Sequence, residues 1–286
     1  MSTEKIAILA DSTCDLSKEL IEKNEVGILP FLVTLGTDSF RDGVDISPQQ
    51  IFDYVASTGV LPKTGAPSVE EYTEFFKKYV DDGYKVIYFC ISGEASSAYS
   101  FANLASKEFE EGAVYAVDSR HLSTGIGLLV LKAVELKNQG LTASKIVEKI
   151  DELKLKTQTS FVVDTLDYLA KGGMCSSMAN IGGKLLGIHP MIIMPNGKLI
   201  SDKKYMFSKM EKVLPKYVED LSRKYTSYDT TRCFITHSMC APEIVEKVKE
   251  KVKACFNFEE IIETTAGSVI TSHCGQGTLG LLFITN

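Results

Sequence analysis

The sequence lacks the marks of several protein classes. It contains no tryptophan and four histidines, and its 31 basic residues are outnumbered by 37 acidic residues, which gives a formal net charge of −6. The charges are interspersed and form no basic stripe, so we expect no nucleic acid as a partner. The apolar run Ile6–Ala10 near the start is shorter than a signal peptide or membrane span requires. We therefore expect a cytoplasmic protein.

Metal and cofactor motifs are also missing. The seven cysteines show no C-x-x-C spacing, which indicates neither a disulfide framework nor a zinc site. The histidines form no i,i+4 pair with carboxylates around a common site. The glycine-rich stretch Asn180–Lys184 is not a phosphate loop, because Leu185 stands where Ser or Thr would follow the lysine. We expect no metal and no cofactor.

The length and the pattern of apolar runs predict two α/β domains. A chain of 286 residues is about twice the usual domain length. In the first half, continuous apolar runs alternate with helix-length segments, which predicts a three-layer domain with a parallel sheet buried on both faces. Helices are expected to begin at Ser47 and Ser68. The strands are expected at Ile6–Ala10, Gly27–Val33, Tyr84–Ile91 and Gly112–Val117.

The second half predicts a different sheet. Asn196-Gly197 is typical of a hairpin turn, here between strands at Pro190–Met194 and Lys198–Ser201. A hairpin pairs antiparallel strands, so we predict a C-terminal α/β domain with a mixed sheet. Its other strands are expected at Ser160–Val163, Cys233–His237, Phe258–Ile262 and Leu279–Ile284. We place the first domain at residues 1–158 and the second at residues 159–286.

Small polar residues follow three strands of the first half, where open α/β sheets bind ligands. For Asp11–Asp15, capping of a helix is the favoured interpretation. For Ile91–Ala98, two interpretations stay open: ligand binding through hydroxyl and backbone N–H groups, or helix capping by Ser92 or Ser96. His121 is expected to have a structural role.

Two further segments offer donors for an anion. Lys63–Ser68 precedes a predicted helix N-terminus, whose N–H groups favour an anion, and Thr64 adds a hydroxyl; an ordinary capped loop is the alternative. His273 lies at the end of a predicted helix, before a glycine turn that starts with Gly275. Adjacent side chains usually point apart, which disfavours a dyad of His273 with Cys274. The remaining options for His273 are a donor to an anion and a capping or core residue.

The order and spacing of these segments together resemble the DegV family of bacterial fatty-acid-binding proteins. The likeness covers essentially the whole chain. It rests on Asp11–Leu16, Arg41–Ile46, Lys63–Ser68, Ser92–Ser96, Asp118–Gly127, Lys171–Gly173 and His273–Thr278. The resemblance implies a protein without catalysis of its own, which encloses one long-chain fatty acid between two domains. It also implies a separate fatty acid kinase as partner, to which the carboxyl group is presented for phospholipid synthesis. Transient contact with a membrane surface is a further expectation.

The resemblance also implies the ligand-binding residues. These are Thr64, Ser92, Gly93, Ser96, His273 and Gly275. The sequence departs from the family pattern at Gly65-Ala66, usually Ser-Gln, and at Met174 and Tyr205-Met206, where the family usually has arginines. Loss of two arginines should weaken charge-assisted contacts, each typically worth about 1.5–3 kcal/mol. The tunnel wall for the acyl chain is expected at Ser177–Gly187 and Ile188–Met194.

Two other functions stay open. One is an acyl-transfer enzyme or thioester hydrolase that uses Cys274 or a loop serine, with His273 or His237 as base. The other is capture of a small carbonyl compound by a histidine, suggested by a resemblance to the substrate-binding half of dihydroxyacetone kinases. A bound ligand of long-chain mass separates these functions from fatty acid binding.

Overall fold

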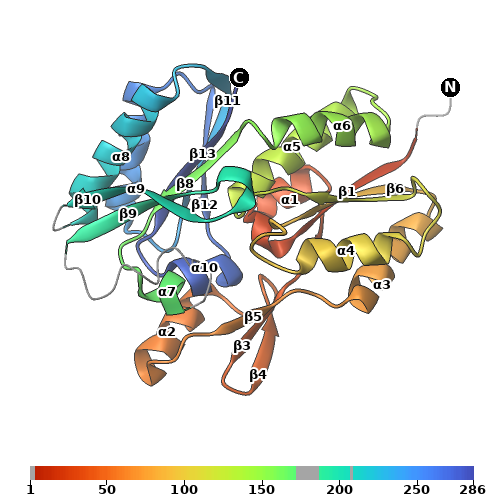
Figure 1. Ribbon diagram of the computed structural model, residues 1–286, viewed down its shortest axis with the longest axis horizontal. Helices are drawn as coiled ribbons and strands as arrows, with labels where there is room; N and C mark the ends of the chain where they lie inside the picture. The colour runs from red at the N-terminus through yellow and green to blue at the C-terminus, as the bar shows by residue number, and fades with distance from the viewer. Residues whose placement is uncertain (1–3, 172–186, 207–208) are drawn as a thin grey trace.

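Two β-sheets, each covered by helices, organise the protein in a computed structural model that describes residues 4–171, 187–206 and 209–286 (Figure 1). The first sheet has the strand order β2-β1-β6-β7, and all of its pairs are parallel. Its strands are β1 (Ile6–Asp11), β2 (Gly27–Leu29), β6 (Lys85–Cys90) and β7 (Val114–Asp118). The predicted parallel sheet is therefore confirmed.

Helices bury both faces of the first sheet. Along β1 the side chains alternate, so that Ile8 packs with α5 and α6 on one face and Leu9 packs with α3 and α4 on the other. The helices of this part are α1 (Lys18–Lys23), α2 (Pro48–Thr58), α3 (Val69–Asp81), α4 (Ala98–Ser106), α5 (Thr124–Asn138) and α6 (Ala143–Leu153). Helices α2 and α3 begin after Ser47 and Ser68, as predicted. The three-layer arrangement follows from the continuous apolar runs.

A small third sheet interrupts the predicted pattern. The expected single strand Gly27–Val33 is wrong: β2 ends before Pro30, and β3 (Leu32–Leu35) belongs to another sheet. Proline has no N–H to continue a strand ladder, so the chain leaves the first sheet there. Strand β3 pairs antiparallel with both β4 (Asp38–Arg41) and β5 (Lys63–Gly65). This small sheet carries Thr64.

The second sheet is mixed, as predicted. Its strand order is β10-β9-β8-β13-β11-β12, with β11 and β12 parallel and the other pairs antiparallel. The strands are β8 (Thr157–Val162), β9 (Ile188–Ile193), β10 (Ile200–Met206), β11 (Tyr228–His237), β12 (Glu260–Thr265) and β13 (Leu279–Thr285). The hairpin between β9 and β10 turns at Asn196 and Gly197, which both have positive φ, of 52° and 84°. Such φ values are what an Asn-Gly turn provides.

Helices also cover the second sheet. Helices α8 (Met210–Lys224) and α9 (Pro242–Cys255) pack on one face through residues such as Val213, Tyr217 and Val248. Shorter elements are η1 (Ser12–Cys14), α7 (Asp167–Lys171), η2 (Pro195–Gly197) and α10 (Ser268–Cys274). Within the described ranges, no helix combines the length and the apolar character that a membrane crossing requires.

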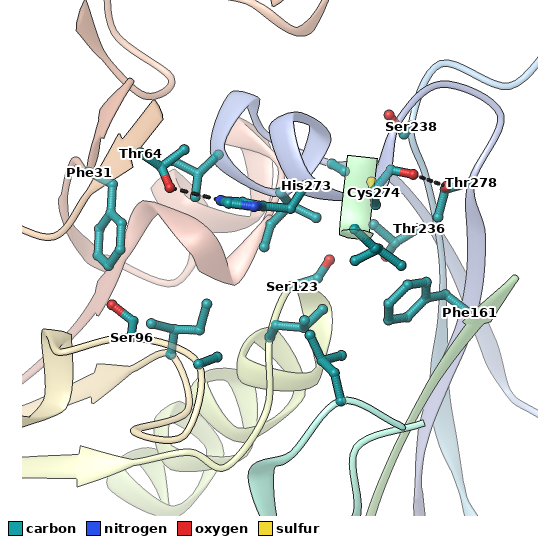
Figure 2. A pocket seen from close by; sticks show the side chains of 18 of the residues that line it. Phe31, Thr64, Ser96, Ser123, Phe161, Thr236, Ser238, His273, Cys274 and Thr278 are labelled. Carbon is teal, nitrogen blue, oxygen red and sulfur yellow. Dashed lines mark hydrogen bonds between the residues drawn. The ribbon is translucent and has the colours of Figure 1, made fainter. Parts of the chain in front are cut away.

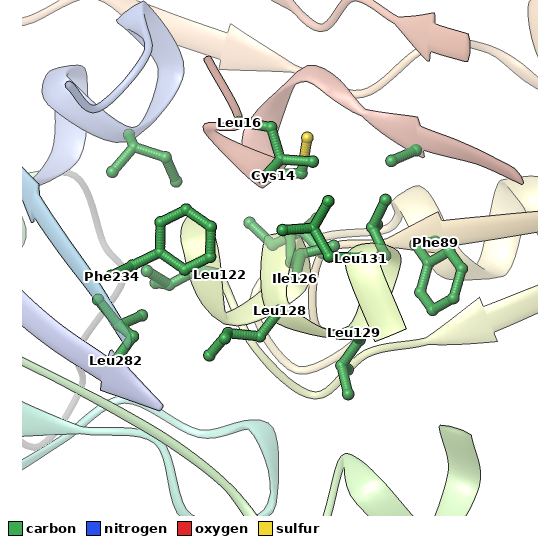
Figure 3. Packing of buried hydrophobic residues seen from close by; sticks show 14 of the residues in the cluster. Cys14, Leu16, Phe89, Leu122, Ile126, Leu128, Leu129, Leu131, Phe234 and Leu282 are labelled. Carbon is green, nitrogen blue, oxygen red and sulfur yellow. The ribbon is translucent and has the colours of Figure 1, made fainter. Parts of the chain in front are cut away.

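Helix α5 joins the two sheets through a shared core. Figure 3 shows Ile126, Leu128 and Leu129 of α5 between Phe89 of the first sheet and Phe234 of the second. Glycine at the start of α5 permits close packing, because a Cβ at Gly127 would lie 2.8 Å from the Leu16 side chain. One continuous apolar cluster therefore spans both halves of the chain.

Candidate ligand-binding site

A cavity of about 740 Å³ is lined by residues from both halves of the chain. Its apolar lining includes Phe31, Ile91, Leu122, Phe161, Val269 and Leu282. Figure 2 shows Thr64, His273 and Ser96 on one side of the cavity, away from Phe161 and Thr278 on the other. Most of the lining is apolar. Thr64, His273 and Ser96 form a cluster of polar side chains on one side, and Thr236, Ser238 and Thr278 are polar residues of the other side.

Thr64 and His273 form the centre of that polar cluster. Thr64 lies on β5, opposite Val33 of β3, and His273 lies in the last turn of α10. The Thr64 Oγ1 and His273 Nε2 atoms are 2.8 Å apart, which is a hydrogen bond between positions 209 residues apart in the chain. Among the described residues, the other ring nitrogen of His273, Nδ1, has no hydrogen-bond partner. Burial lowers the pKa of His273 to about 4, so its ring is neutral at pH 7.

Ser96 also reaches the cavity, from the loop after β6. Ala95, Ser96 and Ser97 all line the cavity, at the N-terminus of α4. The Ser96 hydroxyl accepts a hydrogen bond of 3.2 Å from the Ala98 N–H, so the capping interpretation holds for Ser96. A helix N-terminus beside the cavity favours a negative charge there.

The other three predicted binding residues do not line the cavity. The buried Ser92 hydroxyl donates to the Gly197 carbonyl at 2.8 Å and accepts from the Glu94 N–H. The Gly93 N–H donates to Asp118 Oδ1 at 3.2 Å. At Gly275, where φ is 76°, a Cβ would lie 2.7 Å from the Tyr168 ring. Contact of these three residues with a ligand stays a prediction, and the structure shows each of them in a structural contact.

Two neighbouring polar residues have structural roles. The Asp11 side chain caps no helix, because its carboxylate accepts from the Tyr88 hydroxyl and the Ile91 N–H, each at 2.6 Å. Within the predicted capping segment Asp11–Asp15, Asp15 bonds the N–H of Gly267 at the start of α10. Burial raises the pKa of Asp11 to about 7. His121 is bonded at both ring nitrogens, to the Lys154 carbonyl at 2.8 Å and to Thr159 Oγ1 at 3.0 Å. This agrees with the structural role predicted for His121.

Of the positions that depart from the family pattern, Gly65 and Ala66 line the cavity beside Thr64, whereas Tyr205 and Met206 lie away from it. The Tyr205 hydroxyl donates to Asp220 on α8 at 3.1 Å, and Met206 is 76% exposed; neither lines the cavity. Met174 lies outside the described residues. Among the residues that the structure describes, Lys63 is the one Lys or Arg in the cavity lining.

Only part of the predicted tunnel wall lies within the described residues. Of the predicted segment Ser177–Gly187, residues 177–186 lie outside the described residues. The second segment, Ile188–Met194, is described, and none of its residues lines the cavity. Met191 packs toward α8 and Met194 packs in the shared core. The expectation for this second segment was wrong, because β9 turns its buried side chains into the two cores instead.

Several cavity residues of the second sheet were missed. Ser238 directly follows β11, so the rule that ligands gather at strand ends would have found it in the second sheet too. Thr236 precedes it and bonds Thr264 and Thr124 through its hydroxyl, so that its hydroxyl is already satisfied within the protein. The sequence does not identify Phe31 and Phe161 as cavity residues, because apolar residues in a cavity wall and in a packed core follow the same sequence pattern.

The two candidate bases, His273 and His237, and the candidate nucleophile Cys274 all line the cavity. Both ring nitrogens of His237 have protein partners: Nε2 lies 3.2 Å from Glu263 Oε1, and Nδ1 accepts from the Cys240 N–H at 3.2 Å. Burial raises the pKa of Cys274 to about 12, which keeps the thiol protonated. His273 bonds the Thr64 hydroxyl. A histidine that acts as base in acyl transfer is usually oriented by a carboxylate or carbonyl at its other ring nitrogen, and within the described chain Nδ1 of His273 has no such partner. The described residues also contain no cluster of side chains that could hold a metal ion.

The fold and the site together define an α/β protein with two large sheets, one small sheet and a mostly apolar cavity lined from both halves of the chain. Known proteins share this architecture. The family model described as "Uncharacterised protein, DegV family" matches residues 5–286. The chain belongs to the DegV family.

Individual relatives support this assignment. A DegV domain-containing protein of Clostridium acetobutylicum is 30% identical over 282 residues, which cover 98% of this chain and 99% of the relative. A structure titled as fatty acid binding of a DegV family protein from Thermus thermophilus has a TM-score of 0.90 at 27% identity, and covers 99% of this chain and 100% of that one. A stearic acid-binding protein of Eubacterium ventriosum has a TM-score of 0.80 at 26% identity, with 98% of each chain covered.

Proposed function

We propose that this protein binds one long-chain fatty acid, with its carboxylate at Thr64 and His273 and its acyl chain in the cavity between the two halves. The observation that carries the proposal is the bonded pair Thr64–His273 in the lining of a mostly apolar cavity of about 740 Å³. The similar structures from Thermus thermophilus and Eubacterium ventriosum, described as a fatty acid binding DegV family protein and a stearic acid-binding protein, support it.

The energetics suit such a ligand. A buried carboxylate is costly unless hydrogen-bond donors converge on it. The Thr64 hydroxyl can donate to the carboxylate while its oxygen accepts from the Nε2–H of neutral His273, and that N–H can be shared with the ligand. The N-terminus of α4 beside Ser96 lies at the same cavity. Burial of the acyl chain contributes roughly 0.8 kcal/mol per methylene before the costs of association. The tail therefore supplies most of the affinity and the polar corner sets the orientation.

We propose binding without catalysis, followed by presentation of the carboxyl group to a separate fatty acid kinase. Cys274 is held protonated, and His273 lacks an orienting carboxylate. Lys63 is exposed beside Thr64 and offers a positive charge next to the head group. The kinase partner, and any transient contact with a membrane surface during loading, rest on the family resemblance.

Fatty acid uptake by delipidated protein tests the function. Native mass spectrometry should show one added long-chain fatty acid per chain, and isothermal titration calorimetry should give its affinity. Thr64→Val should weaken binding about tenfold, because it removes one donor to the carboxylate. Thr34→Val is the matched control, since Thr34 lies on the neighbouring strand and bonds Ser39 at the surface.

The control should bind like the natural protein. Delipidated protein that takes up no fatty acid would rule out the proposal. Uptake that is equal in Thr64→Val and Thr34→Val would leave fatty acid binding intact but move the carboxylate away from Thr64.

A further inference from the structure

Helix α10 carries His273 at its C-terminal end, and its N-terminal end rests on two buried carboxylates. Asp15 follows η1, and Asp42 follows β4, so both come from the first half of the chain. The Gly267 N–H donates to Asp15 Oδ1 at 2.9 Å. The Ser268 N–H donates to Asp42 Oδ1 at 2.7 Å. The start of α10 is thus held by side chains that are remote in sequence.

The second oxygen of each carboxylate is held as well. The Ser123 hydroxyl donates to Asp15 Oδ2 at 2.5 Å, and the Ser12 hydroxyl donates to Asp42 Oδ2 at 2.8 Å. Asp42 is 2% exposed and Asp15 is 5% exposed. Both oxygens of both groups therefore have a donor, which fixes the orientation of each carboxylate.

Within the described chain, no Lys or Arg side chain is among the groups that lower the pKa of Asp15 or Asp42. The groups that do so are hydroxyl and backbone N–H donors. Burial nevertheless raises the pKa of Asp15 to about 8 and raises that of Asp42. Two carboxyl groups this close are costly to bury in their charged forms, even with donors on every oxygen. The positive end of the α10 dipole is the favourable partner that the fold supplies, so the carboxylates and the helix hold each other in place.

The contact demands glycine at the start of the helix. A Cβ at Gly267 would lie 3.1 Å from Asp15 Oδ1 and 3.2 Å from Asp42 Oδ1. These separations are tighter than ordinary carbon–oxygen contacts. A side chain there would push the helix away from the carboxylates.

The small sheet holds both ends of α10. Asp42 directly follows β4, and Thr64 lies on β5, while β4 and β5 both pair with β3. Asp42 binds the first turn of α10, and Thr64 bonds His273 in the last turn. His273 lies five residues after Ser268, about 7.5 Å along a helix that rises about 1.5 Å per residue. A displacement at the carboxylates therefore reaches the imidazole through a short, rigid segment.

We propose that Asp15 and Asp42 are positioning residues that set where His273 meets the carboxylate of the ligand. The inference rests on the proposed function for its effect on affinity. Neither residue lines the cavity, so both act through α10.

Asparagine variants test this positioning. Asp15→Asn and Asp42→Asn keep the side-chain shape and one acceptor oxygen, but they replace the second oxygen with an NH2 group, which cannot accept from the Ser123 or Ser12 hydroxyl. Each should weaken fatty acid binding about tenfold and shift the imidazole NMR signals of His273 in the ligand-free protein. Alanine variants should have larger effects.

Asp11→Asn is the matched control. Asp11 is also fully buried, and burial raises its pKa to about 7, but it bonds Tyr88 and Ile91 within the first sheet. This variant should lower stability in urea while its affinity and its His273 signals stay unchanged.

A double-mutant cycle separates positioning from general destabilisation. In the His273→Gln background, Asp42→Asn should cause no further loss of affinity, because its effect passes through His273. Full additivity of the two losses, or unchanged affinity and His273 signals in both asparagine variants, would overturn the proposal. If the natural protein binds no fatty acid, the proposed function fails alone, and the His273 signals still decide whether Asp15 and Asp42 position the ring.

Discussion

At the scale of single residues, the site depends on a histidine that is bonded on one side only. His273 shares one nitrogen with Thr64 and has no partner for the other among the described residues. His121 is buried and bonded at both nitrogens, whereas His273 is half-buried. Burial lowers the pKa of both to about 4, so both rings are neutral at pH 7. They differ in how many of their ring nitrogens have a hydrogen-bond partner. A half-satisfied ring beside a cavity is suited to a ligand, whereas a satisfied one is structural.

The pKa of His273 should rise when a fatty acid binds. A carboxylate beside the ring favours its charged form, which burial alone disfavours. Titration of the imidazole signals by NMR should give a pKa of about 4 without ligand and a higher value with it. Binding would then take up a proton, so the contribution of His273 to affinity should grow as the pH falls toward 4.

His121 is the internal control for this titration. Its pKa, lowered to about 4, should not change on loading, because its two partners are protein groups. Equal pKa values for His273 with and without ligand would contradict a carboxylate at this ring. In the ligand-free protein, both histidines should reduce the free energy of unfolding as the pH falls from about 6.5 to about 4. The sign follows because the unfolded chain binds the proton first.

At the scale of elements, short capped helices next to strands place the polar groups. The strand that carries Thr64 is followed by α3, which begins with a capping box. The Ser68 N–H donates to Glu71 Oε2 at 2.8 Å, and the Glu71 N–H donates to the Ser68 hydroxyl at 3.2 Å. This reciprocal pair satisfies donors at the helix start, four residues from the site.

We expect the capping box of α3 to contribute to the stability of the protein and not to its fatty acid affinity. Ser68→Ala should lower the free energy of unfolding by about 1 kcal/mol, measured in urea, because it removes the acceptor for the Glu71 N–H. Ser57→Ala is the control, since Ser57 bonds the Tyr54 carbonyl in α2 and caps no N–H group. Fatty acid affinity should be unchanged in both variants. A loss of affinity in Ser68→Ala alone would show that the start of α3 also positions Thr64.

At the scale of the whole molecule, the shared core makes the two halves one folding unit. Helix α5 packs against both sheets, and the cluster around it includes Phe89 and Phe234 from opposite sides (Figure 3). The cavity also draws its lining from both halves. The division at residues 1–158 and 159–286 stays a prediction about sequence organisation, and β8 begins at Thr157, beside that division.

Unfolding should therefore be a single transition. Ile126→Ala should destabilise the protein by about 2–5 kcal/mol, because it opens a cavity in the fully buried core. Circular dichroism and release of bound fatty acid should lose signal at the same urea concentration, in the natural protein and in the variant. Leu104→Ala is the control, since Leu104 is 49% exposed and should change little. Two separated transitions would show that the halves unfold independently.

From the sequence we could predict the class of the two large sheets, but not the small third sheet. Continuous apolar runs predicted the parallel sheet buried on both faces, and Asn196-Gly197 predicted the hairpin of the mixed sheet. It also singled out Thr64, Ser96 and His273, which do line the cavity. These features are local, because periodicity, turn chemistry and helix starts depend on residues close together in the chain.

Only the tertiary structure decided how distant segments meet. Pro30 redirects the chain into the small sheet, which brings Thr64 to His273 over 209 positions. Asp15 and Asp42 were expected in no binding role, yet they hold the helix that carries His273. Ser92 was expected at the ligand, yet its hydroxyl bonds the Gly197 carbonyl. A polar side chain after a strand can cap a helix, bind a ligand or join two parts of the fold. Which of these it does depends on the partner that folding brings within hydrogen-bond distance.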